Sequence, residues 1–360
     1  MNISVKGAYG DSNFGDDLLM IVLEDYLSNN LPNEKLNFIG TENNYVKKLL
    51  VKSTFNANKN EEVLIYGGGT QFFSFIEKSS IISILRNNIK KNPLQIFNKV
   101  LSKINPPRKT TINQPEKAFI GFGLGPFNNN RQAINYAKQQ LSSSFYVGVR
   151  DQVSFQYCKD WNINAVLGAD IVFSSYFQNY ISKTKKQQEK NKIAIIVRDW
   201  EWKNSETSYQ DQILKFVENN KDLDFTFIVF AKDKDPKWMK IIKNYEHVIW
   251  EPEKQSVSEF LEILNAYDIF ITARYHGAII AGLMNKKVIC IEIEPKLRIL
   301  TEQIPTFYLW ENSFDIDKLK IMVNKNVHGD HSKSISTLRE KSDNMLVEFV
   351  ETYKKKFYGK

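Results

Sequence analysis

Residues 268–283 read DIFITARYHGAIIAGL, an apolar run that passes through the segment ARYHG at 273–277 into small apolar residues. The run predicts a buried strand over 268–272, and the small residues predict a closely packed helix after it. An arginine, a histidine and a glycine therefore stand where the carboxyl end of a strand meets the amino end of a helix. Ligands bind at such junctions in open α/β sheets, and helix N–H groups attract anions there.

The same alternation of short apolar runs and helical patterns continues along the chain, which indicates parallel βαβ units. In the first half it predicts strands near 2–8, 36–40, 62–66, 117–122, 145–149 and 165–167, with helices near 16–29, 130–141 and 151–160. In the second half it predicts strands near 193–197, 225–230, 247–250, 268–272 and 288–293, with helices near 208–219 and 256–266.

A length of 360 residues is enough for two domains, each with its own core. The polar segment 182–191 predicts a linker, so we expect an N-terminal domain over 1–181 and a C-terminal domain over 192–325. Residues 326–360 are expected to form a terminal helix that packs back on the body and begins at a capping box of Thr337 and Glu340. Two Rossmann-like domains whose parallel sheets face a central cleft form a GT-B-like α/β fold.

Composition and charge narrow the class of protein. The formal charge of +8 comes without a compact basic stripe, so nucleic acid is not an expected partner. Cys158 and Cys290 lie far apart, which argues against a disulfide and for a reducing compartment. The first residues lack a signal-peptide core, and no apolar run reaches the roughly 18 residues of a membrane span. We therefore expect a cytoplasmic protein.

Residues 72–109 stand apart, because eight basic residues and one acidic residue alternate there with many apolar ones. Such a basic amphipathic segment could lie on a membrane surface and make the protein peripheral to it. The other interpretation, which we favour, is a helical excursion that packs on its own domain with lysines in solvent.

Glycine-rich turns follow several strands of the first half. The turn at 7–17, GAYGDSNFGDD, carries Asp11 and Asn13 and ends in two acids, Asp16 and Asp17. The carboxylates of these two acids either interact only with the positive dipole end of the next helix or act directly on a ligand. A second turn contains Gly67, Gly68 and Gly69, whose backbone N–H groups could cradle an anion or a sugar. Arg150 directly follows the strand predicted near 145–149. It either pairs with Asp151 at the start of a helix or reaches the ligand.

The second half places cations at its strand ends. Arg198, Arg274, Lys296 and Arg298 each follow a predicted strand closely, which suggests a pocket for a carboxylate or phosphate. His276 could act there as a general acid or bind phosphate, the alternative being a packed neutral imidazole. The remaining histidines show no metal spacing and are expected at the surface or in loops: His247, His328 and His331.

In this order, the motifs GDSNFGD at 10–16, the triple glycine, VRD at 149–151, GAD at 168–170 and RYH at 274–276 resemble those of polysaccharide pyruvyltransferases. The resemblance covers roughly residues 5–300. It implies a GT-B-like fold and transfer of the pyruvyl group of phosphoenolpyruvate to a pair of sugar hydroxyls as a ketal. It also implies that Arg198, Arg274 and His276 contact the donor, and we place Tyr275, Gly277 and Lys296 beside them.

The function that we expect is a pyruvyltransferase of cell-surface polysaccharide biosynthesis that uses phosphoenolpyruvate, with no metal and no cofactor. His276 would be the acid or the phosphate partner, and Asp16 the base for a saccharide or lipid-linked saccharide acceptor. The acceptor side would include Asp11, Asn13, Asp17, Gly67, Gly68, Gly69 and Arg150. Two alternatives stay open: a GT-B glycosyltransferase that uses a nucleotide sugar, and a catalytically silent scaffold of a biosynthetic complex.

Overall fold

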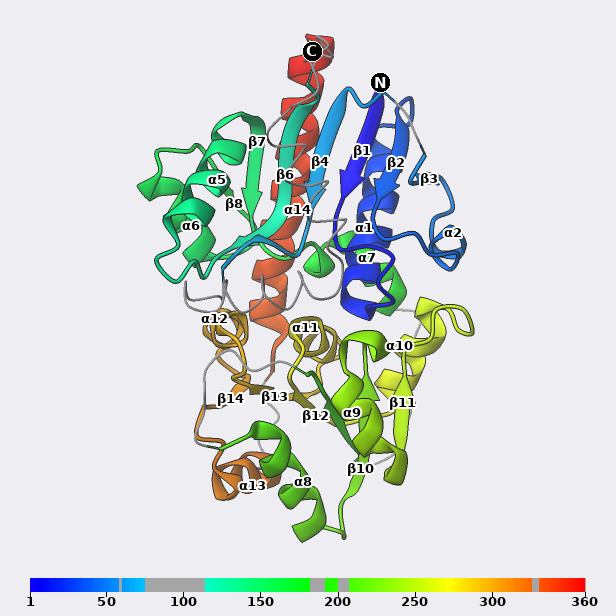
Figure 1. Cartoon of the computed structure of the whole chain (residues 1–360), viewed down its shortest axis with the longest axis vertical. Helices are drawn as coiled ribbons and strands as arrows, with labels where there is room; N and C mark the ends of the chain where they lie inside the picture. The colour runs from blue at the N-terminus through cyan, green and yellow to red at the C-terminus, as the bar shows by residue number, and fades with distance from the viewer. Residues whose placement is uncertain (58–59, 75–113, 182–191, 200–206, 326–329, 360) are drawn as a thin grey trace, which may run out of the picture.

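The computed structural model describes residues 1–57, 60–74, 114–181, 192–199, 207–325 and 330–359. They form two α/β domains that meet at the carboxyl ends of their parallel sheets, with both chain termini on the first domain (Figure 1). This confirms the expected GT-B-like fold. The predicted linker, most of the segment 72–109 and His328 lie outside the described residues.

The first sheet has the strand order β3-β2-β1-β4-β6-β7-β8, and β5 pairs with β6. Every pairing in it is parallel. The strands are β1 (Asn2–Lys6), β2 (Lys35–Ile39), β3 (Thr54–Phe55), β4 (Val63–Gly67), β5 (Thr70–Phe72), β6 (Glu116–Leu124), β7 (Ser144–Val149) and β8 (Val166–Leu167). The helical elements are α1 (Phe14–Asn30), α2 (Val46–Leu49), α5 (Arg131–Ser142), α6 (Gln152–Asp160), η1 (Ile171–Phe173) and α7 (Ser175–Ile181).

The second sheet, also parallel, has the order β11-β10-β9-β12-β13-β14, which is the strand order of a Rossmann fold. Its strands are β9 (Lys192–Ile196), β10 (Asp224–Val229), β11 (His247–Ile249), β12 (Ile269–Thr272), β13 (Lys287–Ile291) and β14 (Tyr308–Trp310). Its helical elements are α8 (Tyr209–Asn219), η2 (Lys232–Lys234), α9 (Pro236–Ile241), η3 (Ile242–Asn244), α10 (Val257–Asn265), α11 (Tyr275–Leu283), α12 (Pro295–Gln303) and α13 (Ile316–Asn324). The order reverses between β9 and β12, so a crevice opens where these two strands end.

The last helix, α14 (Ser332–Tyr358), packs on the first domain although it follows the second in the chain (Figure 1). Two buried tyrosines of the first domain fix it, because Tyr26 and Tyr146 donate to the carbonyls of Leu346 and Met345. The predicted capping box is wrong. The helix begins five residues before Thr337, whose hydroxyl instead donates to the carbonyl of Lys333 inside the helix.

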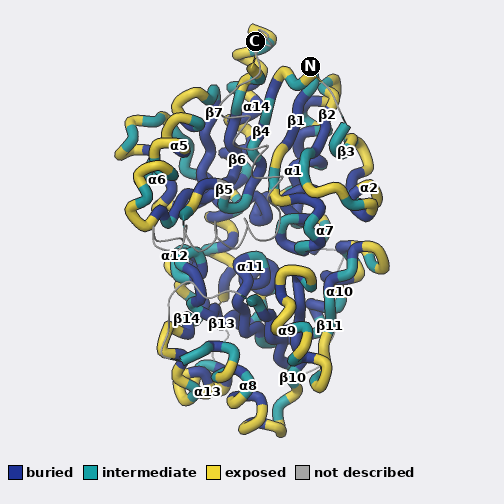
Figure 2. The backbone as a smooth tube through the Cα atoms, viewed as in Figure 1, coloured by how far each residue is buried: buried dark blue, intermediate teal, exposed yellow. Residues whose placement is uncertain are grey.

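The two cores are built from the apolar runs that the sequence shows, and Figure 2 shows buried backbone along the strands of both sheets. Cys158 and Cys290 are buried and do not form a disulfide. His331 is a correction to the expected surface position, since it is buried before α14 and lies against Thr306 and the carbonyl of Lys286. Within the described ranges, the structure contains no helix long and apolar enough to cross a membrane.

The domains are joined by the first residues of α1. The N–H of Phe14 donates to the carbonyl of Phe230 at 3.0 Å, although the two residues belong to different domains. The Phe14 ring is fully buried and lies 4.6–5.1 Å, centroid to centroid, from the rings of Phe230, Trp250 and Phe260. This contact holds the start of α1 over the crevice of the second sheet.

Candidate active site

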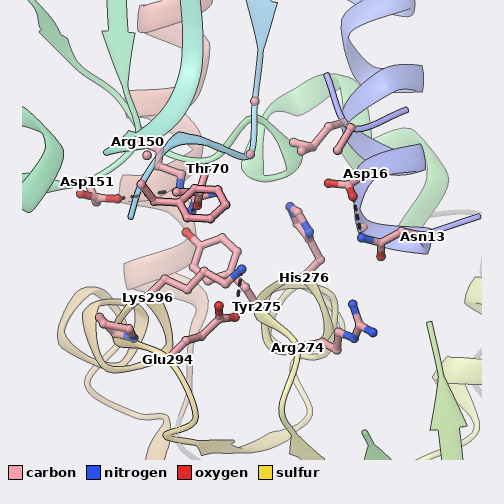
Figure 3. Close-up of a pocket in the computed structure, with 18 of the residues that line it drawn as sticks. Asn13, Asp16, Thr70, Arg150, Asp151, Arg274, Tyr275, His276, Glu294 and Lys296 are labelled. Atoms are coloured by element: carbon pink, nitrogen blue, oxygen red, sulfur yellow. Dashed lines mark hydrogen bonds and ion pairs between the residues drawn. The ribbon is translucent and has the colours of Figure 1, made fainter. Parts of the chain in front are cut away.

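A cavity of about 630 Å³ lies between the domains, where the carboxyl ends of both sheets meet. Its walls come from the turns after β1, β4, β5, β6 and β7 in the first domain, and from the segments after β9, β10, β12 and β13 in the second. Figure 3 shows His276 rising from the start of α11, with Arg150 and Thr70 on one side and Asn13 and Asp16 on the other. Both switch points of the fold therefore open into one space.

Most of the residues predicted for the site line this cavity. They are Asn13, Asp16, Gly67, Gly68, Gly69, Arg150, Arg198, Arg274, Tyr275, His276 and Lys296. Three others lie outside its lining: Asp11, Asp17 and Gly277.

Gly277 is needed for packing. A Cβ at this position would lie 2.6 Å from the hydroxyl of Thr272 and 2.7 Å from a methyl of Ile196. The glycine thus lets α11 approach β9 and β12 closely, which brings the neighbouring His276 and Arg274 to the crevice.

Asp17 is fully buried beneath the cavity and joins the domains. Its carboxylate accepts hydrogen bonds from Trp250 of the second domain and from the hydroxyl of Tyr45, at 2.8 and 2.9 Å. Burial raises its pKa to about 8, against the effect of these two donors. Asp11 also joins the domains, because it forms an ion pair of 2.7 Å with Lys234.

The predicted cations of the second domain gather on one wall. Arg198 is ion-paired with Glu294, and the same carboxylate lies 2.9 Å from the ammonium of Lys296. Arg274 is buried, donates to the carbonyl of Val197 and is ion-paired with Asp235. The wall therefore combines three cations with two carboxylates.

Charge on this wall is balanced by the protein itself. The cavity lining contains five basic and five acidic residues, with His276 in addition. Burial lowers the pKa of Lys296 to about 8, and the attraction of Glu294 only partly opposes this. Burial also disfavours the ionised form of Glu294, yet Arg198 and Lys296 outweigh it and hold the pKa of this carboxyl below its usual value. An incoming anion must therefore share or displace these carboxylates.

Another cation of the cavity lining, Arg150, comes from the first domain. Its guanidinium donates to Asp170 at 3.1 Å and to the hydroxyl of Thr70 at 3.0 Å. It also lies 4.5 Å from the centre of the Tyr275 ring, a cation–π contact between the domains. The predicted pairing with Asp151 exists as well, at 3.7 Å, while Asp151 caps α6. Arg150 thus pairs with Asp151 as predicted and also lines the cavity.

His276 stands at the meeting point of the two domains. Its Nε2 lies 3.6 Å from Asp170, and its other ring nitrogen faces Gly15, where a Cβ would approach Nδ1 to 2.2 Å. Nε2 is buried and has no hydrogen-bond partner among the described residues. The ring is therefore half-buried and lines the cavity.

Asp16 lies across the cavity from the cationic wall. Its carboxylate accepts a hydrogen bond of 2.5 Å from the side chain of Asn13. This bond orients the carboxylate at the first turn of α1, where the helix dipole also favours a negative charge. Asn13 and Asp16 thus act as one unit.

Sequence reasoning missed the acidic partners of the site. Asp235 and Glu294, which hold the three cations, were not predicted, and Asp170 was noted only as part of a strand-end turn. Asp235 and Arg274 are separated by 39 positions, and Arg198 and Glu294 by 96. Such distant pairs leave no local pattern in the sequence. Their positions after strands were the one usable signal.

Arg298, the remaining predicted cation of the second domain, does not line the cavity and is ion-paired with Glu292 and Glu311. In the part of the chain that the structure describes, no group of three or more metal-ligating side chains lies close enough to hold a metal ion.

The fold and the interdomain site define a two-domain α/β protein of GT-B architecture. A UDP-GlcNAc 2-epimerase of Methanocaldococcus jannaschii is similar to it in structure, with a TM-score of 0.57 and 12% identity over 97% of this chain and 99% of that one. A UDP-N-acetylglucosamine 2-epimerase of Rickettsia bellii has a TM-score of 0.55 and 10% identity over 100% and 99% of the two chains. These likenesses concern the fold.

The sequence itself belongs to the polysaccharide pyruvyl transferase family, whose pattern matches residues 13–295. The match contains every predicted site residue except Asp11 and Lys296. No curated protein matches the chain significantly.

Proposed function

We propose that the protein transfers the pyruvyl group of phosphoenolpyruvate to two hydroxyls of a saccharide, or of a lipid-linked saccharide, in the synthesis of a cell-surface polysaccharide. One observation carries the proposal. A histidine with a buried, unpartnered ring nitrogen lies between a wall of three cations and an acidic side chain from the other domain. Membership of the family agrees with it.

The donor is a small molecule with a carboxylate and a phosphate, and the cationic wall suits both groups. Arg198 and Arg274 can each bind an oxyanion through two N–H groups, and Lys296 adds a point charge. The Glu294 carboxylate that now holds Arg198 and Lys296 occupies the place of such an oxyanion. We infer that donor binding rearranges this pair.

The reaction requires protonation of the methylene carbon of the donor, which builds positive charge on the carbon that carries the phosphate. One sugar hydroxyl adds to that carbon and loses its proton, the C–O bond to phosphate breaks, and a second hydroxyl closes the ketal. Of the two hydroxyl protons, one balances the proton delivered to the methyl group and the other leaves with phosphate.

We assign these proton transfers to two residues. His276 would deliver a proton or hold the phosphate, and Asp16 would accept the proton of the attacking hydroxyl. They come from opposite domains and line the same cavity, as Figure 3 shows. A positioned acid or base contributes about 10²–10⁴-fold to a rate.

Binding of phosphoenolpyruvate to the full chain, measured by titration calorimetry, tests the donor without knowledge of the acceptor. Arg274→Ala should abolish the binding. Turnover is then measured as phosphate release in the presence of aryl glycosides of common hexoses, with the ketal methyl group detected by NMR. His276→Ala should lower the rate about 10²–10⁴-fold. The matched control is His247→Ala, at an exposed histidine on β11.

The alternative function is a glycosyl transfer from a nucleotide sugar. Its support is the likeness of fold to the epimerase of Methanocaldococcus jannaschii, which was crystallised with UDP-GlcNAc and UDP. The same calorimetric experiment with UDP separates the two. Binding of UDP without binding of phosphoenolpyruvate would overturn the pyruvyl transfer that we propose.

A further inference from the structure

The side chain next to the centre of the site does not itself line the cavity. Asp170 lies in the turn between β8 and η1 and is 1% exposed. Its Oδ1 accepts a hydrogen bond from the N–H of Val172 at 3.1 Å, and its Oδ2 accepts one from Arg150 at 3.1 Å. Both oxygens are thus fixed by the first domain.

The same Oδ2 faces a residue of the second domain. It lies 3.6 Å from Nε2 of His276, a nitrogen that is buried and has no hydrogen-bond partner within the described ranges. A protonated nitrogen at this buried place gains the attraction of a carboxylate, whereas a bare lone pair would face a negative oxygen. The geometry therefore favours a proton on Nε2.

The other ring nitrogen faces a different environment. Nδ1 lies against Gly15 at the first turn of α1, on the side of the ring where Asp16 stands (Figure 3). The charged groups around the ring are Asp170, Arg150, Asp16, Arg274 and Lys296. Of the carboxylates, Asp170 is the one within ion-pair distance of the ring.

The carboxyl group of Asp170 is held in its ionised form. Its burial disfavours ionisation, but the neighbouring His276, the charge of Arg150 and the hydrogen bonds from Arg150 and the N–H of Val172 outweigh this and hold the pKa of the carboxyl below its usual value. An ionised carboxylate is therefore available to the imidazole at neutral pH.

We propose that Asp170 is the positioning residue of His276: it keeps a proton on Nε2 and so makes Nδ1 the nitrogen that exchanges a proton with the cavity. Because the two residues belong to different domains, the correct tautomer forms only when the domains are docked. That His276 uses this proton in catalysis rests on the proposed function, whereas the choice of tautomer does not.

The first test needs no variant of Asp170. The full chain is labelled with ¹⁵N-histidine, and long-range ¹H–¹⁵N spectra are recorded at a pH where the imidazoles are neutral. The chain has four histidines, and the spectrum of His276→Ala identifies the signals of His276. We expect the tautomer with the proton on Nε2. A proton on Nδ1, or an equal mixture, would overturn the proposal.

The second test removes the charge and keeps the shape. In Asp170→Asn, the preference of His276 for the tautomer with the proton on Nε2, followed by the same spectra, should be lost, because the neutral amide no longer presents a negative oxygen to that nitrogen. Asp160→Asn is the matched control, because this exposed aspartate on α6 carries the same charge and accepts a hydrogen bond from Gln156. An unchanged tautomer preference in folded Asp170→Asn protein would count against the proposal. If that variant does not fold, the wild-type tautomer still decides.

Activity adds a third measurement that separates this proposal from the proposed function. If the protein is a pyruvyltransferase, Asp170→Asn should lower kcat more than tenfold with little change in the KM for phosphoenolpyruvate. If the protein neither binds nor turns over this donor, the proposed function fails. The two NMR results remain valid in either case.

Discussion

At the scale of single residues, Gly15 shows how closely the domains meet around the site. A methyl group at this position would lie 2.2 Å from Nδ1 and 2.8 Å from Cγ of His276. We expect Gly15→Ala to displace the imidazole and to lower phosphate release by about 10²-fold, since a misplacement of about 1 Å has effects of that size. Steady-state kinetics measure this.

The fold of the variant provides the control for this prediction. Alanine favours a helix over glycine by about 1 kcal/mol, so α1 itself should not be weakened. Lost activity with an unchanged denaturation midpoint would thus point to the imidazole contact. Full activity together with unshifted His276 resonances would show that the domains have room for a side chain here.

Lys296 gives donor binding a predictable dependence on pH. Its pKa is lowered to about 8, chiefly by burial, so the ammonium is protonated at pH 7 and mostly neutral at pH 9. An anion bound by this residue should therefore bind about five- to tenfold more weakly at pH 9 than at pH 7. Calorimetry with phosphoenolpyruvate at both pH values measures the difference.

The matched variant for this prediction is Lys296→Arg. A guanidinium keeps its charge throughout this range, so the variant should bind the donor equally at both pH values. A wild-type affinity that does not change between them would mean that the Lys296 charge does not contribute to binding.

Residue types and positions after strands led to the prediction of Arg198, Arg274, Lys296, His276 and Asp16, which all line the cavity, and of Arg298, which does not. Their partners were not predictable, because a bond such as that of Arg274 with Asp235 depends on how two distant turns meet. Asp17 and Gly277 were predicted for the site but do not line the cavity, and this also depends on how distant segments meet. Asp17 and Gly277 stand in ligand-binding motifs, but one side chain joins the domains and the other position serves packing.

At the scale of elements, the parallel strands were predictable because most are continuous apolar runs buried on both faces. The strands β3, β5 and β14 were missed, since two or three residues give no periodic pattern. The start of α14 was misplaced for another reason. Thr337 and Glu340 match a capping box by residue type, but nothing in that pattern shows that the helix has already begun five residues earlier.

The attachment of α14 can be tested through two hydroxyls. Tyr26 on α1 and Tyr146 on β7 each donate a buried hydrogen bond of 2.6 Å to consecutive carbonyls of this helix. Tyr26→Phe and Tyr146→Phe should each lower the free energy of unfolding by about 1 kcal/mol, because the carbonyl stays buried. Urea denaturation measures the loss. Tyr136→Phe, at an exposed tyrosine of α5, is the control and should be neutral.

At the scale of the whole molecule, the site exists only between the domains. His276, Arg198 and Lys296 come from one domain, while Asp16, Asp170 and Arg150 come from the other. The start of α1 and the turn before it hold the domains together in part, because Phe14, Asp17 and Asp11 each bond or pack across the interface, while α7 contacts α10 and η1 contacts α11. These three residues of the motif at 10–17 thus help to dock the domains, whereas Asn13 and Asp16 line the cavity.

Phe14→Ala tests this role of the interface. The phenyl ring is fully buried against Phe230, Trp250 and Phe260, so its loss should cost about 3–5 kcal/mol. Since these contacts lie between the two domains, we expect the domains to part before either unfolds. We therefore expect a larger radius of gyration in small-angle scattering and a loss of the Nε2 tautomer preference of His276.

The comparison variant is Phe216→Ala, which removes a ring of the same size from α8, inside the second domain. It should destabilise the protein by a similar amount and leave the radius of gyration and the imidazole signals unchanged, because Phe216 packs on Phe225 of its own domain. If the radius of gyration increases equally in both variants, domain docking does not depend on Phe14. The position of the His276 imidazole would then depend on the contact between Arg150 and Tyr275 instead.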